Sequence, residues 1–168
     1  MINSKVALIG LTNSGKSTLF NRLTNSKIAI FSKHQQTTRD RLIKTVYWKN
    51  REFDLIDCGG YIFHPKNDIE EKIIIQTNNA INESKLIIFL VSYKEYILDE
   101  ELRLARIIQK KFKKNIILAI NKCDNNIKNN FNYFSLGIKN VFYISALHGI
   151  NIGDLLDKVL FFYHDKII

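Results

Sequence analysis

A glycine-rich stretch near the amino terminus has the residue types and the spacing best suited to chemistry. Gly10-Leu11-Thr12-Asn13-Ser14-Gly15-Lys16-Ser17 matches G-x-x-x-x-G-K-[ST], a loop whose glycines let successive backbone N–H groups converge on phosphates. We expect Lys16 to bridge the β- and γ-phosphates of a nucleotide and the Ser17 hydroxyl to ligate Mg²⁺. A helix expected directly after the loop adds the partial positive charge of its N-terminus. The phosphate-binding residues predicted here are Gly10, Asn13, Ser14, Gly15, Lys16, Ser17 and Thr18.

A second short motif, Asp57-Cys58-Gly59-Gly60, has the pattern D-x-x-G and follows a predicted strand. Its carboxylate is placed to hold Mg²⁺ through water, and the Gly60 amide can donate to the γ-phosphate. The pattern is weak by itself. After a phosphate loop and at a strand end, it predicts the metal and γ-phosphate side of the same pocket.

A third motif, Asn121-Lys122-Cys123-Asp124, has the pattern N-K-x-D and predicts the base specificity. The Asp124 carboxylate can accept hydrogen bonds from the N1–H and the exocyclic amine of guanine. Adenine would leave it unpaired, at a cost of about 1–3 kcal/mol or more. We expect the aliphatic stem of Lys122 to lie over the base and Asn121 to tie the loop together. The backbone of a later stretch is expected to reach the guanine carbonyl, and its residues are Ser145, Ala146 and Leu147.

The elements that must position these motifs can be read from the hydrophobic pattern. Nearly continuous apolar runs at 5–9, 86–91, 116–120 and 141–144 are typical of parallel strands covered on both faces. The segments 42–48 and 51–56 flank a short Lys49-Asn50 turn and predict a hairpin. Apolar residues at helical spacing in 104–112 and 152–160 predict helices between and after the strands. This alternation predicts a doubly wound α/β sheet of six mostly parallel strands, whose ligands bind at the carboxyl ends of the strands.

Composition excludes several other classes of protein. The longest clean apolar run has six residues, far short of the roughly twenty that a membrane span needs. The start lacks the apolar stretch of a signal peptide, and Cys58 and Cys123 fit neither a metal spacing nor a disulfide framework. We therefore expect a cytosolic chain with neither membrane nor DNA as a partner. The net charge of +9 has two explanations: A/T-biased codon usage, which suits the 27 Ile, 18 Asn and 19 Lys, or contact with RNA.

With these motifs on hand, the sequence resembles the Era-like bacterial GTPases, and within them the first GTPase domain of the Der (EngA) family. The resemblance covers nearly the whole chain. Its most telling stretches are Thr38-Arg39-Asp40-Arg41, Asp57-Cys58-Gly59-Gly60, Tyr133-Phe134-Ser135-Leu136-Gly137 and Ser145-Ala146-Leu147-His148-Gly149. The last two look like the family signatures F-x-x-L-G and S-A-x-H-G. The resemblance implies a Ras-like P-loop fold with helices on both sheet faces, GTP hydrolysis to GDP, and a transient partner in the large ribosomal subunit or its rRNA during ribosome biogenesis.

The resemblance also implies a site in the first switch. Alignment with T-R-D favours Thr38 over Thr37 as a third Mg²⁺ ligand beside Ser17 and Asp57, and so as part of the catalytic set with Lys16, Gly60 and Asn13. Gln35-Gln36 stand where the family usually has Pro-Gly, which removes the turn residues from this segment. Der-like proteins also carry a second GTPase domain and a KH-like domain. We expect residues 1–168 to form a single GTPase domain without these, either a piece of a longer protein or a shortened gene.

Hydrolysis lacks an obvious catalytic residue. Many Ras-like enzymes orient the attacking water with a Gln after D-x-x-G, but Tyr61 stands there and is expected to pack as an apolar cover. In Era-like relatives, an Asn at the position of Asn13 helps to hold a K⁺ that offsets developing charge, so K⁺ is a further candidate cofactor. His148, beside the base pocket, is expected to order its loop rather than to take part in chemistry.

Two other functions stay open on the sequence. The altered first switch and the missing Gln favour a guanine-nucleotide-binding regulatory module with little hydrolysis of its own. An Era-like GTPase domain in tRNA modification is the third reading, which the S-A-L-H-G and F-S-L-G stretches disfavour.

Overall fold

The computed structural model describes residues 4–25, 42–125 and 131–164. Within these residues, six strands form one sheet in the order β2-β3-β1-β4-β5-β6. The strands are β1 (Lys5–Gly10), β2 (Leu42–Trp48), β3 (Arg51–Gly60), β4 (Leu86–Ser92), β5 (Asn115–Asn121) and β6 (Asn140–Tyr143). The helices are α1 (Lys16–Thr24), α2 (Asp68–Glu83), α3 (Asp99–Phe112), α4 (Ile152–His164) and the short 3₁₀ helix η2 (Phe131–Leu136).

The sheet is parallel except at one edge. β1 pairs in parallel with β3 and β4, and β4, β5 and β6 continue the parallel array. Only β2 runs antiparallel to its neighbour, as the second arm of a hairpin with β3. Lys49 and Asn50 at the turn both have positive φ, +48° and +60°, as a two-residue turn that follows the right-handed strand twist requires. The predicted hairpin and the predicted mostly parallel sheet are confirmed.

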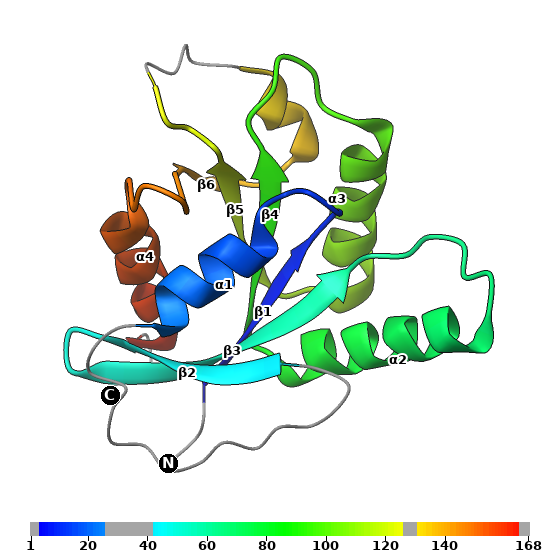
Figure 1. Ribbon diagram of the computed structural model, residues 1–168, viewed down its shortest axis with the longest axis horizontal. Coiled ribbons are helices and arrows are strands. Elements are labelled where there is room, and N and C mark those ends of the chain that lie inside the picture. The colour runs from blue at the N-terminus through cyan, green and yellow to red at the C-terminus, as the bar shows by residue number, and fades with distance from the viewer. Residues whose placement is uncertain (1–3, 26–41, 126–130, 165–168) are drawn as a thin grey trace.

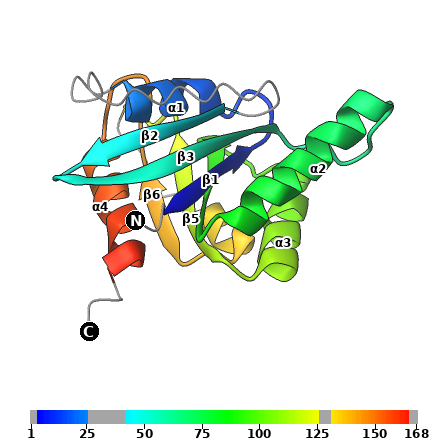
Figure 2. The ribbon, with the colours of Figure 1, turned by 90° about the horizontal axis from the view of Figure 1, so that it is seen from below.

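The core lies in two layers, one on each face of the sheet, and Figure 2 shows the sheet between its helices. Alternate residues of β1 divide between the layers, with Ala7 and Ile9 on one side and Val6 and Leu8 on the other. α2 and α3 cover the first face, while α1 and α4 cover the second. Burial on both faces explains why the central strands appear in the sequence as unbroken apolar runs rather than as alternating patterns.

Two elements of the fold were not predicted. α2 has a run of three isoleucines, 73–75, in place of helical spacing, and Ile75 is exposed. Its core contacts come instead from Thr77, Ala80 and Ile81 near the carboxyl end. The η2 turn was recognised only as a family signature, because a single 3₁₀ turn leaves no period in the sequence.

The sheet order places the loops that carry the motifs at one end of the sheet, where the parallel strands finish. β1, β3, β4, β5 and β6 are parallel and all end on this side, and the arrows of β1, β3, β4 and β5 all point upward in Figure 1. The predicted location of the site, at the carboxyl ends of parallel strands, therefore matches the fold.

Candidate nucleotide-binding site

The loop between β1 and α1 has the alternating backbone conformation of an anion-binding loop. Asn13 and Gly15 have left-handed φ values of +68° and +92°, whereas Ser14 between them does not. Alternation of this kind turns successive N–H groups toward one side, which is the geometry of an anion-binding nest. At the start of the loop, a Cβ on Gly10 would stand 2.6 Å from the Leu90 carbonyl oxygen and 2.7 Å from Ser14 Oγ, so the close packing here requires glycine.

The N-terminus of α1 differs from those of the neighbouring helices. α2 and α3 each have three acidic residues in the first turn, and α2 is capped by the Asn67 side chain. α1 has no acidic residue in its first turn and no side-chain cap on its amides. Its first amides and the positive end of its dipole are therefore left for an external anion. Half-buried Lys16 and exposed Ser17 open this helix, so an ammonium and a hydroxyl stand beside the free amides.

Asn121 joins the two halves of the site. It is the last residue of β5, and its side chain is buried. Nδ2 donates to the Ser14 carbonyl at 3.0 Å, and Oδ1 accepts from the Ala146 amide at 2.9 Å. A Cβ on Gly15 would stand 2.3 Å from Asn121 Nδ2, so glycine is needed here for space as well as for its φ. The phosphate loop and the 145–149 loop are thus fastened to one amide, as expected from the N-K-x-D motif.

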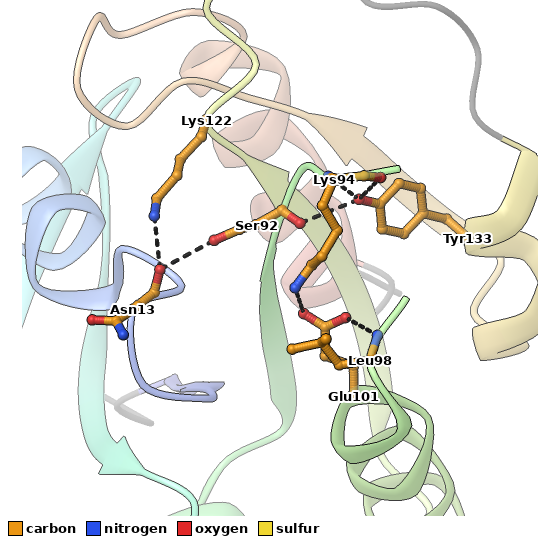
Figure 3. Close-up of polar contacts among 7 residues, drawn as sticks. All are labelled: Asn13, Ser92, Lys94, Leu98, Glu101, Lys122 and Tyr133. Atoms are coloured by element: carbon orange, nitrogen blue, oxygen red, sulfur yellow. Dashed lines mark hydrogen bonds and ion pairs between the residues drawn. The ribbon is translucent and has the colours of Figure 1, made fainter. Parts of the chain in front are cut away.

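Lys122 and Ser92 both donate hydrogen bonds to the backbone of the phosphate loop. Lys122 Nζ donates to the Asn13 carbonyl at 2.8 Å, and Ser92 Oγ donates to the same oxygen at 3.1 Å. Figure 3 shows the two donors reaching Asn13 from neighbouring strands, while the Asn13 side-chain amide points away from both. The ammonium of Lys122 is therefore anchored to the backbone of the phosphate loop.

Asp124 has one oxygen held by a hydrogen bond, and its side chain is partly exposed. Ser145 Oγ donates to Asp124 Oδ1 at 2.5 Å, and His148 Nε2 lies 4.0 Å from Oδ2. The Asp124 side chain is still 39% exposed, so it has room for further donors. The Ser145 hydroxyl also accepts from the His148 amide at 3.1 Å, which orders the loop that follows β6.

The D-x-x-G motif ends β3 directly beside the phosphate loop. Gly60 is paired in register with Gly10, and the Tyr61 amide donates to the Gly10 carbonyl at 3.4 Å. Asp57 Oδ1 accepts from the Gly59 amide at 3.0 Å, with Gly59 at a φ of +69°. Within the described residues, Asp57 Oδ2 is then available as a metal ligand near the end of β3, which pairs with the start of the phosphate loop. Carboxylate and hydroxyl oxygens are ligands that Mg²⁺ accepts, so the residues present fit the expected metal.

Tyr61 lies against the core rather than free above the loop. Its ring meets Phe63 edge-on with 5.2 Å between centroids, and burial raises the pKa of its hydroxyl above the ordinary value. The expected first-switch residues Thr38, Thr37, Gln35 and Gln36 lie outside the residues that the structure describes.

One residue of the site had no signal in the sequence. Arg22, near the end of α1, donates through Nε to the Ala146 carbonyl and through Nη2 to the Leu147 carbonyl. Its acceptors are backbone oxygens far along the chain, and a backbone acceptor has no residue type that a motif could reveal.

Comparison with known proteins agrees with this geometry. A family model described as 50S ribosome-binding GTPase matches residues 5–122, which includes the phosphate loop, D-x-x-G and the start of N-K-x-D. The chain belongs to this GTPase family. No helix in the described part of the chain is long and apolar enough to cross a membrane.

Among individual relatives, GTPase Der of Mycoplasmopsis pulmonis is 39% identical over 94% of this chain, and GTPase Der of Malacoplasma penetrans is 41% identical over 93%. The chain spans 36% of the length of each. The resemblance to Der is thereby confirmed for this GTPase domain.

Solved structures of Era have the same fold. Era bound to MgGDPNP and a segment of 16S ribosomal RNA superposes with a TM-score of 0.75 at 26% identity, covering 95% of this chain and 56% of that one. A variant of Aquifex aeolicus Era bound to GDP and AlF₄⁻ gives a TM-score of 0.73 at 27% identity, covering 96% and 57%. The Ras-like P-loop GTPase fold predicted from the sequence is confirmed.

Proposed function

We propose that this chain is a GTP-binding and GTP-hydrolysing switch that acts in ribosome assembly. The observation that carries the proposal is the double contact of Asn121, whose side chain fastens the phosphate loop to the 145–149 loop. A pocket that needs both loops has to hold a ligand with phosphates at one end and a base at the other. Family membership supports the same conclusion.

At the phosphate end, the amides of residues 13–18 and the ammonium of Lys16 bind the β- and γ-phosphates. Ser17 and Asp57 hold Mg²⁺, with Thr38 as the proposed third residue. When bound, Mg²⁺ neutralises charge that develops on the phosphate oxygens. The Gly60 amide donates to the γ-phosphate, and its pairing with Gly10 supports this placement.

At the base end, Asp124 accepts from the N1–H and the amino group of guanine, and the backbone of the 145–147 stretch supplies a donor to the carbonyl. The partly exposed side chain of Asp124 and the ordered loop after β6 support this assignment. Lys122 covers one face of the base with its stem, supported by the anchoring of its ammonium at Asn13.

Hydrolysis in this proposal depends on K⁺. Tyr61 occupies the position of a water-orienting Gln and is packed against Phe63. Beside Lys16, the charge that develops between the β- and γ-phosphates then needs a further positive partner in place of an arginine finger. The Asn13 side chain is free of the two donors that hold its carbonyl, and it offers an amide oxygen to a monovalent cation. A cation there stabilises charge in a site already organised by backbone dipoles.

The proposed partner is a ribosomal particle, the large subunit or its rRNA. The family description names 50S ribosome binding, which supports the large subunit. The Era relative was solved with 16S ribosomal RNA of the small subunit, which supports only contact with ribosomal RNA in general. The net charge of +9 suits an RNA-rich partner. We also propose that residues 1–168 act as one GTPase domain, since the described residues form one six-stranded sheet with a core layer on each face.

A regulatory module with little hydrolysis is the alternative, and the packed Tyr61 favours it. Single-turnover hydrolysis of saturating GTP, in K⁺ and in Na⁺ at equal ionic strength, separates the two. The switch predicts faster turnover in K⁺ and loss of that difference in Asn13→Ala. Equal and negligible turnover in both salts, with GTP bound, favours the regulatory module. Sedimentation with ribosomal subunits in the presence of a non-hydrolysable GTP analogue tests the partner.

A further inference from the structure

Arg22 links the helix of the phosphate loop to the loop beside the base. It lies in the last turn of α1, and its guanidinium reaches across to the segment after β6. Nε donates to the Ala146 carbonyl, and Nη2 donates to the Leu147 carbonyl at 2.6 Å. Two consecutive carbonyls are thus held by one planar fork, which a single point charge could not reproduce.

Gly149 gives independent evidence that the loop is shaped around this guanidinium. A Cβ on Gly149 would stand 2.9 Å from Arg22 Nη1 and 3.4 Å from Cζ. The residue also has a φ of +74°, which disfavours any side chain. The glycine that ends S-A-L-H-G therefore leaves the space that Arg22 occupies.

The fork determines the direction of one amide. In a trans peptide, the C=O and the following N–H point in opposite directions, so holding the Ala146 carbonyl toward α1 turns the Leu147 N–H away from α1. The neighbouring amides are already engaged: Ser145 N–H with the Ile150 carbonyl, Ala146 N–H with Asn121 Oδ1, and His148 N–H with Ser145 Oγ. Among these four amides, only that of Leu147 has no acceptor within the described residues.

We propose that Arg22 is a positioning residue for guanine specificity, which aims the Leu147 amide at the 6-carbonyl of the base. This inference rests on the proposed function, since it assigns the base end of the pocket to guanine. A base with an amino group at position 6 would bring a donor against a donor that the fork prevents from turning away. Arg22 itself does not touch the nucleotide.

The test compares diphosphates that differ at position 6. GDP and IDP both carry the carbonyl and the N1–H, whereas 2-aminopurine riboside diphosphate lacks both and keeps the 2-amino group. Arg22→Ala is expected to weaken the binding of GDP and of IDP by about tenfold each, and the binding of the 2-aminopurine nucleotide by less than about twofold, as measured by calorimetric titration. Arg22→Lys, which keeps the charge at the helix end but loses the fork, should weaken GDP by an intermediate factor.

Arg106→Ala on α3 is the matched control, because Arg106 is exposed and α3 covers the face of the sheet opposite to α1. It should leave all three affinities as in the wild type. Equal losses for all three nucleotides in Arg22→Ala and Arg22→Lys would mean a general structural role and would overturn the inference, as would wild-type GDP affinity in both. If the unmodified chain itself does not prefer GDP to ADP, the proposed function fails instead.

Discussion

Polar side chains in the pocket differ in burial according to whether they serve the protein or the ligand. Asn121 is 3% exposed and uses both ends of its amide on backbone groups of two loops. The side chain of Asp124, three residues later, is 39% exposed and has only one oxygen held by a hydroxyl. The motif spacing predicted both residues, because each acts through its own side chain. Arg22 could not be predicted, because its partners are backbone carbonyls.

Base specificity at the residue scale should reside in Asp124. Asp124→Asn is expected to lower GTP affinity by at least about tenfold and to raise affinity for xanthosine triphosphate, since the amide can donate to the carbonyl that replaces the 2-amino group. The hydroxyl of Ser145 can still donate to the amide oxygen, so the loop is kept. Competition between the two triphosphates measures the change. Unaltered GTP preference in the variant would show that the base end of the pocket is wrongly assigned.

Lys16 should carry the phosphate contact. Lys16→Ala removes a charge-assisted contact of roughly 1.5–3 kcal/mol, so GTP affinity should fall by about ten- to a hundredfold in a fluorescence titration. Lys72→Ala, an exposed lysine on α2, is the control with the same loss of charge and should bind normally. The phosphate-loop assignment does not survive if both variants bind GTP alike.

At the scale of elements, α1 and α2 differ in how the backbone amides of their first turns are satisfied. α2 begins with Asn67 Oδ1 accepting from the Glu70 amide at 2.9 Å, and Glu70 Oε2 accepts from the Lys66 amide at 2.7 Å. α1 has no such cap. The strands were predictable because burial on both faces makes continuous apolar runs, and α2 was not, because its three consecutive isoleucines hide the helical period.

The Asn67 cap of α2 should contribute measurably to the free energy of unfolding. Asn67→Ala leaves the Glu70 amide without its acceptor and is expected to lower the free energy of unfolding by about 1 kcal/mol. Asn79→Ala, an exposed position within the same helix, should be neutral or slightly stabilising, because alanine has the higher helix propensity. Urea unfolding of the three proteins checks this, and equal effects of the two substitutions would contradict the role of the cap.

At the scale of the whole molecule, a chain of polar contacts runs from the phosphate loop to α3, which covers the face of the sheet opposite to α1. Ser92, which holds Asn13 through its hydroxyl, accepts from the Tyr133 hydroxyl through its carbonyl at 3.2 Å. The same hydroxyl accepts from the Lys94 amide, and Lys94 Nζ pairs with buried Glu101 of α3 at 2.6 Å (Figure 3). Only the assembled sheet brings these segments together, so this network was beyond sequence prediction.

Alkaline stability should report on Tyr133. Burial raises the pKa of Tyr133 to about 12, against 10.0 for a free phenol. The folded state keeps the hydroxyl proton to a higher pH than the unfolded state does. The contribution of the neutral Tyr133 hydroxyl to the free energy of unfolding is therefore fully present below about pH 10 and is lost as pH rises toward 12. The difference in free energy of unfolding between wild type and Tyr133→Phe should therefore shrink from pH 9 to pH 11. Tyr96→Phe, at a residue that is 71% exposed, is the control. A constant difference for Tyr133→Phe would refute the argument.

The central claim is that one pocket, built by two fastened loops, selects guanine and binds phosphates. Displacement of a fluorescent GDP analogue from the 168-residue chain, by GDP and by ADP at equal Mg²⁺, tests it most directly. The account predicts that GDP displaces the probe at a concentration at least about a hundredfold lower than ADP does, because ADP leaves the Asp124 carboxylate and the carbonyl-binding amide unpaired. Displacement by GDP and ADP at the same concentration would contradict the account.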